Sequence, residues 1–296
     1  MFSLLFPGQG SQIVGMGKEF YENFNYVKEL FNQADDLLNK KISKIIINGP
    51  KEELDQTENT QPAIFLVSYS IFKSIENETN LNLKNARYFA GHSLGEYSAL
   101  CCAGAISFQD TLLLLRDRGK AMQNAVPTGV GGMIAILGSE IELIKNTIIE
   151  NKDNFSCYIA NDNSNGQVVV SGEIAELKKF EIDLNKKNIK FVRLPVSAPF
   201  HCPLMKNATA DMRQKIINSN FTKPYVEIIS NVSASSLNEP EIIKKLLIDQ
   251  IEKPVRWRES IIKMINLNIN NFIEIGPGKV LSGLVKRIDR NVNINQ

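Results

Sequence analysis

The segment "YFAGHSLGEYSAL", residues 88–100, decides the fold of this chain. It begins with aromatic and apolar residues, continues with Gly-His-Ser-Leu-Gly, and ends in residues that suit a helix. The pattern Gly91-x-Ser93-x-Gly95 has the form of a nucleophile elbow, in which a serine occupies a tight turn between a strand and a helix. The glycines stand where a side chain would collide with neighbouring backbone. An ordinary glycine-flanked turn can carry the same short pattern, so the rest of the chain has to distinguish the two.

Outside this segment, short apolar runs alternate with longer helical stretches, as an α/β protein requires. We expect strands at 3–6 and 86–91 and within 270–278, and helices at 63–75, at 94–102 and after Ser107. The sequence therefore predicts an α/β fold.

The middle of the chain has a different pattern. After the glycine-rich joint at 125–132, residues up to 195 are expected to form elements in the order β-α-β-β-α-β. This order is that of the ferredoxin-like unit. We predict a small ferredoxin-like domain at 127–195, inserted into a larger α/β domain made of 1–126 and 196–296.

The composition excludes several classes of function. The net charge of the 296 residues is +2 and no run of lysine or arginine occurs, which argues against a nucleic-acid binder. The four cysteines have no CxxC spacing, which favours reduced thiols in the cytoplasm over disulfides or zinc. No stretch is long enough to span a membrane, and no cleavable leader precedes the first strand. A soluble cytoplasmic protein without a metal site is therefore expected.

A serine nucleophile needs a base within hydrogen-bond reach, usually histidine. The chain offers only His92 and His201. His92 is adjacent to Ser93 on a sharp turn, so their side chains should diverge, and a structural role is expected for it. His201, in the loop "VSAPFHCPL", is the remaining candidate base. A loop histidine on its own would more often be structural.

Acyl chemistry also needs donors for an oxyanion. The backbone N–H of Leu94, the residue after the serine, is one candidate. The N–H of Gln9, in the glycine-rich "PGQGSQ", is the second, although a simple turn after the first strand would look the same.

Arg118 is the most informative charge. Its neighbours at i±3 and i±4 on a helix are the apolar residues Leu114, Leu115, Ala121 and Met122. An arginine on an apolar face needs an anion, which either a structural salt bridge or a substrate carboxylate could supply.

Taken together, these segments resemble the malonyl-CoA:acyl carrier protein transacylase family and the acyltransferase domains of polyketide and fatty acid synthases. The resemblance covers nearly the whole chain, through "FPGQGSQ" (6–12), "GHSLGEYSAL" (91–100), "RGKAMQNAVP" (118–127), "GGMIAILG" (131–138), "NDNSNGQVVVSG" (161–172), "VSAPFHCPLM" (196–205), "SNV" (230–232), "QIEKPVRW" (250–257) and "EIGPGKVLSGL" (274–284). It implies an α/β-hydrolase-like core with a ferredoxin-like insertion.

The resemblance also implies roles for individual residues. Ser93 would be the nucleophile, His201 the base, and Gln9 and Leu94 the oxyanion hole, while Arg118 would bind the malonyl carboxylate. Gln250 would position His201 through its backbone carbonyl. The substrate pocket would include Phe200, in the malonyl-selecting pattern, together with Asn161 and Met122.

The implied reaction is a ping-pong transfer of malonyl from malonyl-CoA, through a malonyl-serine, to the phosphopantetheine thiol of acyl carrier protein in fatty acid synthesis. CoA is a substrate, so no cofactor is expected, and the protein is expected to be a monomer. Two alternatives remain at this stage. A serine hydrolase would share Ser93 and His201 but transfer the acyl group to water, and a non-catalytic scaffold would only bind the carrier protein.

Overall fold

The computed structural model describes residues 1–196 and 198–296. The strands are β1 (Phe2–Phe6), β2 (Tyr88–Gly91), β3 (Gly131–Leu137), β4 (Cys157–Ser164), β5 (Gln167–Glu173), β6 (Lys190–Arg193), β7 (Glu227–Ile229), β8 (Ser236–Leu237), β9 (Asn271–Glu274) and β10 (Asn293–Asn295). The helices are α1 (Lys18–Asn23), α2 (Asn25–Leu38), α3 (Ile42–Asn48), α4 (Lys51–Leu54), α5 (Thr57–Glu78), α6 (Leu94–Cys102), α7 (Phe108–Asn124), α8 (Ile141–Glu150), α9 (Ile174–Lys186), α10 (Lys206–Asn218), α11 (Pro240–Gln250), α12 (Trp257–Asn266) and α13 (Val280–Ile288), with short 3₁₀ turns at Leu83–Asn85 and Pro203–Met205.

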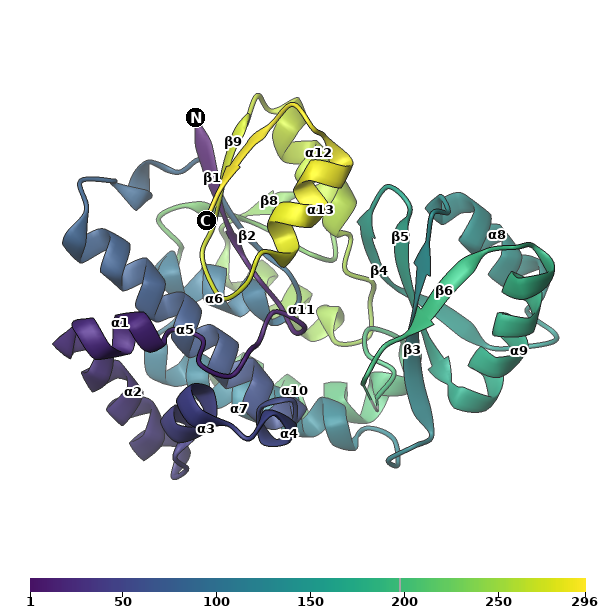
Figure 1. Cartoon of the computed structure of the whole chain (residues 1–296), viewed down its shortest axis with the longest axis horizontal. Helices are drawn as coiled ribbons and strands as arrows, with labels where there is room; N and C mark the ends of the chain where they lie inside the picture. Colours follow the sequence, from purple (N-terminus) through teal and green to yellow (C-terminus); the bar gives the residue numbers. More distant parts are fainter. Residues whose placement is uncertain (197) are drawn as a thin grey trace.

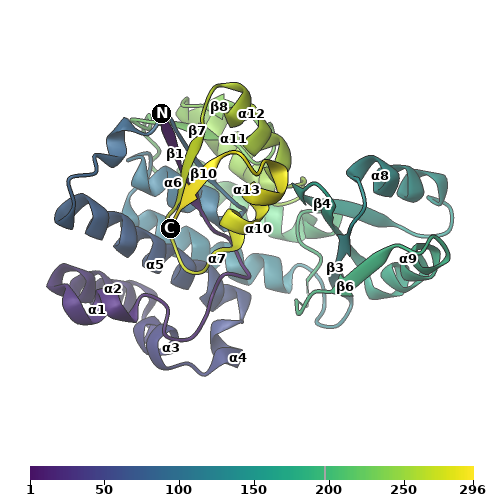
Figure 2. The same ribbon diagram turned by 45° about the horizontal axis from the view of Figure 1, so that its top comes forward.

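The structure is a mixed α/β fold with two sheets. The first has the strand order β10-β9-β1-β2-β7-β8, and its strands are parallel except for the β7–β8 pair. The second has the order β4-β5-β3-β6, with antiparallel neighbours throughout. Figure 1 shows the two sheets side by side, and Figure 2 shows the second sheet with α8 and α9 projecting from the rest of the chain.

The first sheet is covered on both faces, which explains the apolar runs of its central strands. Side chains alternate along β1, so Leu4 and Phe6 pack into one hydrophobic cluster and Leu5 into another. The first cluster lies against α5, α6 and α7, and the second includes Trp257 and Phe272. Figure 1 shows α5 on one side of β1 and α12 and α13 on the other. The parallel core thereby holds the carboxyl ends of β1 and β2 in fixed positions.

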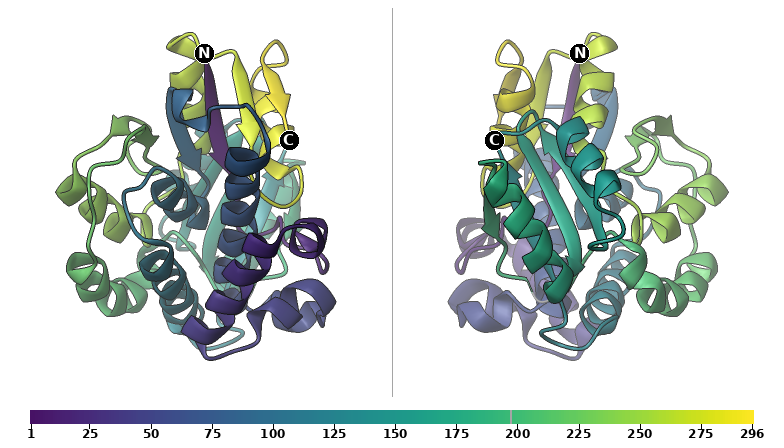
Figure 3. Two further views of the ribbon diagram at one scale, coloured as in Figure 1. Left: turned by 90° about the vertical axis from the view of Figure 1, so that its left-hand side faces the viewer. Right: turned by 90° about the vertical axis from the view of Figure 1, so that its right-hand side faces the viewer.

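The second sheet uses its two faces differently. Ile134 and Ile136 of β3 pack with residues of α8 and α9, while Met133 and Ala135 belong to the large cluster of the first sheet. Figure 3 shows α8 and α9 on the outer face of this sheet. The inner face is therefore directed towards the carboxyl end of β2.

Segment 255–258 joins the two sheets. The N–H of Val255 donates to the carbonyl of Ala160 (2.8 Å), and the N–H of Asp162 donates to the carbonyl of Val255 (2.9 Å). The guanidinium of Arg258 donates to both oxygens of the buried Asp162 carboxylate, at 2.9–3.1 Å. These contacts fix β4 relative to the first sheet.

Most of the predicted elements are confirmed, including the order β-α-β-β-α-β between β3 and β6. The helix expected at 63–75 is longer and begins at Thr57, ahead of Pro62. Its first turn is held by side-chain contacts, since Thr57 Oγ1 donates to Gln123 Oε1 of α7 (3.0 Å) and Thr60 Oγ1 to the carbonyl of Leu54 (2.6 Å). Tertiary contacts therefore extend this helix beyond its apolar run.

The glycines of the serine turn are required by backbone contacts. A Cβ at Gly91 would lie 1.9 Å from the carbonyl carbon and oxygen of Gly95, and a Cβ at Gly95 would lie 2.1 Å from the carbonyl oxygen of Phe6. Neither distance is possible without moving β1, β2 or α6. The turn of the predicted elbow can exist here only with glycine on both sides of Ser93.

We expect Gly91→Ala to lower the free energy of unfolding by about 3 kcal/mol or more, because the new methyl group has only backbone to displace. Urea unfolding followed by circular dichroism measures this loss. Gly283→Ala is the matched control, since Gly283 lies on the exposed face of α13 with no atom within 4 Å of a new Cβ. That variant should be neutral or slightly more stable. Equal stabilities of the two variants would contradict the steric account of the elbow.

Candidate active site

Ser93 lies at the turn between β2 and α6 in a strained conformation. Its φ and ψ are 54° and −110°, and few residues other than glycine adopt such a positive φ. Its N–H donates to Asn231 Oδ1 (2.7 Å), and its carbonyl accepts from Gln250 Nε2 (3.1 Å). Strain of this kind persists only where surrounding contacts hold it. The two side-chain contacts provide that support and leave the hydroxyl free to face the cavity.

The structure brings Ser93, His201 and Gln250 together in one hydrogen-bonded chain. Ser93 Oγ lies 2.9 Å from His201 Nε2, and His201 Nδ1 lies 2.7 Å from the backbone carbonyl oxygen of Gln250. A carbonyl only accepts, so Nδ1 carries the proton and Nε2 accepts from the serine hydroxyl. Burial lowers the pKa of His201 to about 3, with a smaller effect from the Arg118 charge. The ring is therefore neutral in neutral solution and able to accept a proton from the serine.

His92 points away from the serine hydroxyl, as its position on the turn predicts. Its Nε2 lies 2.8 Å from Asn163 Oδ1 on β4, and its ring packs on Trp257 with centroids 5.6 Å apart. These contacts connect the elbow to β4 and α12. The geometry gives His92 a packing role and leaves His201 as the histidine at Ser93.

Arg118 projects from α7 into the same cluster and is 1% exposed. Its Nη1 donates to Gln61 Oε1 (2.7 Å), and its Nη2 donates to Gln250 Oε1 (2.8 Å) and to Ser93 Oγ (3.1 Å). All three acceptors are neutral.

No carboxylate lies within 4 Å of this guanidinium in residues 1–196 and 198–296, so the expected alternative of a direct structural salt bridge is wrong for the described chain. Burial lowers the pKa of Arg118, because a charged guanidinium loses its hydration there. Arg116, two residues away, instead pairs with Asp117 at 2.9 Å near the surface. A buried arginine with only neutral partners is suited to bind an anion.

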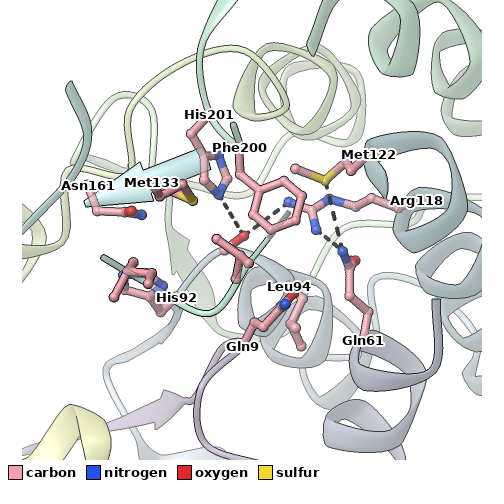
Figure 4. Close-up of a pocket in the computed structure, with 13 residues that line it drawn as sticks. Gln9, Gln61, His92, Leu94, Arg118, Met122, Met133, Asn161, Phe200 and His201 are labelled. Atoms are coloured by element: carbon pink, nitrogen blue, oxygen red, sulfur yellow. Dashed lines mark hydrogen bonds between the residues drawn. The ribbon is translucent and has the colours of Figure 1, made fainter. Parts of the chain in front are cut away.

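A cavity of about 100 Å³ opens beside Ser93 (Figure 4). Its walls come from the loops after β1 and β2, from β3 and β4, from the segment after β6, and from α5, α6 and α7. The lining residues are Gln9, Gln61, His92, Ser93, Leu94, Arg118, Met122, Met133, Asn161, Leu194, Val196, Phe200 and His201. All the residues predicted for the site line this cavity, apart from Gln250. Gln250 lies behind the lining and forms hydrogen bonds with Ser93, His201 and Arg118.

Gln9 and Leu94 lie beside the serine, Gln9 from the loop after β1 and Leu94 from the start of α6. Leu94 is the first residue of α6, where a backbone N–H has no acceptor within its own helix. The loop that carries Gln9 packs tightly on the elbow, because a Cβ at Gly8 would lie 2.5 Å from the carbonyl oxygen of His92. The two residues are thus placed where N–H donors could face a substrate oxygen.

Sequence patterns did not reveal three polar residues of this site. Gln61 lies ahead of the apolar run that predicted a helix, and it holds Arg118. Asn231 anchors the elbow through Ser93 N and through the carbonyl of Gly91 (2.6 Å). Glu96 lies buried behind the elbow and accepts from Gln250 Nε2 (2.7 Å). Asn231 lies in the motif "SNV" and Glu96 in the motif "GHSLGEYSAL", but neither motif indicated these contacts.

Within 1–196 and 198–296, no three His, Cys, Asp or Glu side chains gather as a metal site would require. In the same residues, none of the helices combines the length and the apolar character needed to cross a membrane.

Comparison with known proteins gives consistent matches over the full chain. The model of the acyl transferase domain matches residues 3–293. A malonyl CoA-acyl carrier protein transacylase of Bacillus subtilis (strain 168) is 43% identical over 293 residues, covering 98% of this chain and 91% of the relative.

Solved structures agree with these matches. An acyl-carrier-protein-S-malonyltransferase from Bartonella henselae superposes with a TM-score of 0.93 at 40% identity, covering 99% of this chain and 94% of that one. A malonyl-transacylase in complex with its type II PKS acyl-carrier protein superposes with a TM-score of 0.94 at 36% identity, covering 99% of this chain and 94% of that one.

Proposed function

The chain belongs to the malonyl CoA-acyl carrier protein transacylases of the acyl transferase family, and we propose that it acts by a ping-pong mechanism through a malonyl-serine intermediate. As an acyltransferase of this family, it takes malonyl-CoA as donor and acyl carrier protein as acceptor. The proposal concerns how the residues of the site carry out the two transfers.

In the first transfer, Ser93 Oγ attacks the thioester carbonyl of malonyl-CoA while His201 Nε2 takes the hydroxyl proton. The N–H groups of Gln9 and Leu94 stabilise the oxyanion. The C–S bond then breaks, and His201 returns its proton to the departing CoA thiolate. The malonyl group is left as an ester on Ser93.

In the second transfer the roles are reversed. The phosphopantetheine thiol of the carrier protein gives its proton to His201 and attacks the ester, and Ser93 recovers a proton as it leaves. The carbonyl of Gln250 holds the imidazole in the required orientation during both transfers, at 2.7 Å from Nδ1. The reaction needs no cofactor, because the CoA thioester supplies the activated acyl group.

One observation supports a malonyl group, above other acyl groups, as the group transferred. The Arg118 guanidinium is buried, has neutral partners and reaches to 3.1 Å from Ser93 Oγ. A guanidinium binds a carboxylate through two parallel hydrogen bonds. An acyl group that carries its own carboxylate, as malonyl does, supplies an anion that can pair directly with this guanidinium beside the reacting serine. The apolar side chains of Met122, Met133 and Phe200 enclose the same space.

The test is intact-mass spectrometry after brief exposure of the protein to malonyl-CoA, followed by addition of phosphopantetheinylated acyl carrier protein. We expect a malonyl adduct on the enzyme, which then moves to the carrier protein. A protein that forms no adduct would agree with a scaffold, and one that releases free malonate in place of malonyl carrier protein would be a hydrolase. Either result would contradict the proposed function.

We also propose that the two sheets represent an α/β-hydrolase-like core, at 1–126 and 196–296, and a ferredoxin-like insertion at 127–195. The mostly parallel first sheet, with its serine turn after β2, supports the first assignment. The β-α-β-β-α-β order of the second unit supports the other.

His201→Ala is expected to slow formation of the malonyl adduct by about 10²–10⁴-fold, the usual effect of losing a positioned base. His92→Ala is the matched control, since His92 lines the same cavity and bonds to Asn163 instead of Ser93. It should mainly lower thermal stability. Single-turnover acylation with rapid quenching measures both rates. Equal rate losses in the two variants would contradict the assignment of the base.

A further inference from the structure

Glu96 is a buried carboxylate that the proposed mechanism does not use. It lies in the first turn of α6 behind Ser93 and is 2% exposed. Its Oε2 accepts from Gln250 Nε2 (2.7 Å) and from the N–H of Asn231 (3.2 Å). A carboxylate so deep in the protein needs a charge partner or a proton.

Gln250 connects this carboxylate to the arginine of the site. Its side-chain Oε1 accepts from Arg118 Nη2 at 2.8 Å, while its Nε2 donates to Glu96 at 2.7 Å. The two charges are therefore separated by a single amide group and are not in direct contact. The resulting chain runs from guanidinium through amide to carboxylate.

The other groups around Glu96 carry no compensating charge. Tyr97 lies on the same helix, the hydroxyl of Ser230 and the N–H of Asn231 approach from the loop after β7, and Gln250 approaches from α11. Arg118, from α7, is the one cation that acts on Glu96 among the described residues. In the free enzyme the two buried charges therefore balance.

A substrate carboxylate disturbs this balance. Once a malonyl group pairs with Arg118, the buried cluster contains one cation and two anions. Two carboxylates that share one guanidinium cannot both stay ionised in a buried site without a large cost. Burial already raises the pKa of Glu96 to about 7, against the opposing effects of Gln250, Asn231 and Arg118. Pairing of Arg118 with the malonyl carboxylate raises it further, because the guanidinium then no longer offsets the burial of Glu96.

We propose that Glu96 is the counter-charge of Arg118 in the free enzyme and takes up one proton from solvent when a malonyl carboxylate binds. The new O–H forms on Oε1, since Oε2 already accepts from Gln250 and Asn231. The proton is released when the malonyl group leaves. Binding of malonyl thioesters is thereby linked to pH, whereas binding of acetyl thioesters is not. This inference rests on the proposed function, in which Arg118 binds the malonyl carboxylate.

The test is calorimetric titration of Ser93→Ala, which cannot be acylated, with malonyl-CoA and with acetyl-CoA. Titrations at pH 6, 7 and 8, each in two buffers with different heats of ionisation, give the number of protons taken up. Acetyl-CoA controls for the phosphates of CoA. We expect malonyl-CoA to take up about one proton more than acetyl-CoA at pH 8, and much less than one more at pH 6, where Glu96 is already protonated. Equal uptake for both ligands at pH 8 would overturn the proposal.

Glu96→Gln in the same background keeps the shape of the side chain and removes its charge. We expect the additional proton uptake to disappear and the affinity for malonyl-CoA to follow the same pH dependence as that for acetyl-CoA between pH 6 and 8. Glu274→Gln is the matched control, because Glu274 is also buried but bonds to Leu281 and Ser282 of α13. It should retain the uptake. Uptake that survives in Glu96→Gln would assign the proton to another group, such as His201, and overturn the proposal.

A further measurement covers the case in which Glu96→Gln does not fold. Infrared difference spectra of Ser93→Ala with and without malonyl-CoA at pH 8 should show a new band from a protonated carboxyl group, and acetyl-CoA should not produce it. Absence of this band overturns the proposal. If the wild-type enzyme forms the malonyl adduct but Ser93→Ala shows no additional proton uptake, only the role of Glu96 is refuted. If the wild-type enzyme forms no malonyl adduct, the proposed function itself is refuted.

Discussion

Ser93→Ala is expected to abolish the covalent malonyl adduct completely while leaving the fold intact. The change removes the attacking oxygen and its contacts with His201 Nε2 and Arg118 Nη2. The backbone contacts of residue 93 with Asn231 and Gln250 do not involve the side chain and remain. We therefore expect the free energy of unfolding to change by less than about 1 kcal/mol. Intact mass after exposure to malonyl-CoA and urea unfolding measure the two effects.

Ser98→Ala provides the matched control for this experiment. Ser98 is buried on the same helix, and its hydroxyl has no hydrogen-bond partner among the described residues. That variant should form the malonyl adduct at the wild-type rate. If Ser93→Ala still accumulated the adduct, the nucleophile would have to be another residue.

Arg118→Ala is expected to reduce kcat/KM for malonyl-CoA by about 2–5 kcal/mol in free-energy terms, or roughly 30-fold to several thousandfold. The loss arises because the malonyl carboxylate would enter a buried site with no cation to pair with it. Acetyl-CoA carries no carboxylate and loses nothing comparable. The ratio of kcat/KM values for malonyl-CoA and acetyl-CoA, measured with the same carrier protein, should therefore shift strongly towards acetyl-CoA.

Two further variants sharpen this test. Arg118→Lys should recover only part of the malonyl activity, because an ammonium cannot form the paired hydrogen bonds of a guanidinium. Arg116→Ala should behave like wild type, since Arg116 pairs with Asp117 near the surface. An equal loss of malonyl and acetyl transfer in Arg118→Ala would show that the arginine is structural.

The serine turn and its neighbours could be predicted from sequence because local backbone geometry demands them. Gly91 and Gly95 leave room for backbone only, and the apolar run before Ser93 becomes a strand buried on both sides. Ser107 was similarly predictable as a helix start, since its hydroxyl accepts from the N–H of Asp110 at 3.0 Å. The Asp110 carboxylate in turn accepts from the Ser107 hydroxyl at 2.7 Å.

The polar support of the site could not be predicted in this way. Gln61, Asn231 and Glu96 act through contacts between segments far apart in the sequence, and no spacing rule marks such contacts. Gln250 is the clearest example of a role that the sequence predicts only in part. The family resemblance indicated a role for its backbone carbonyl, but only the structure reveals that its side chain also joins Arg118 to Glu96. An amide that donates on one side and accepts on the other fits between two charges for reasons visible only in three dimensions.

The hydrogen bonds of the site have a consequence for how the chain folds. They join residues 108 positions apart for Ser93 and His201, 132 apart for Arg118 and Gln250, and 49 apart for His201 and Gln250. Contacts between such distant segments form late, because long loops must close before any contact energy is gained. During refolding, helices such as α5 and α7 can form early, yet transferase activity returns only after the last of these segments has docked. Recovered activity is therefore a measure of complete folding for this chain, which bulk helix content is not.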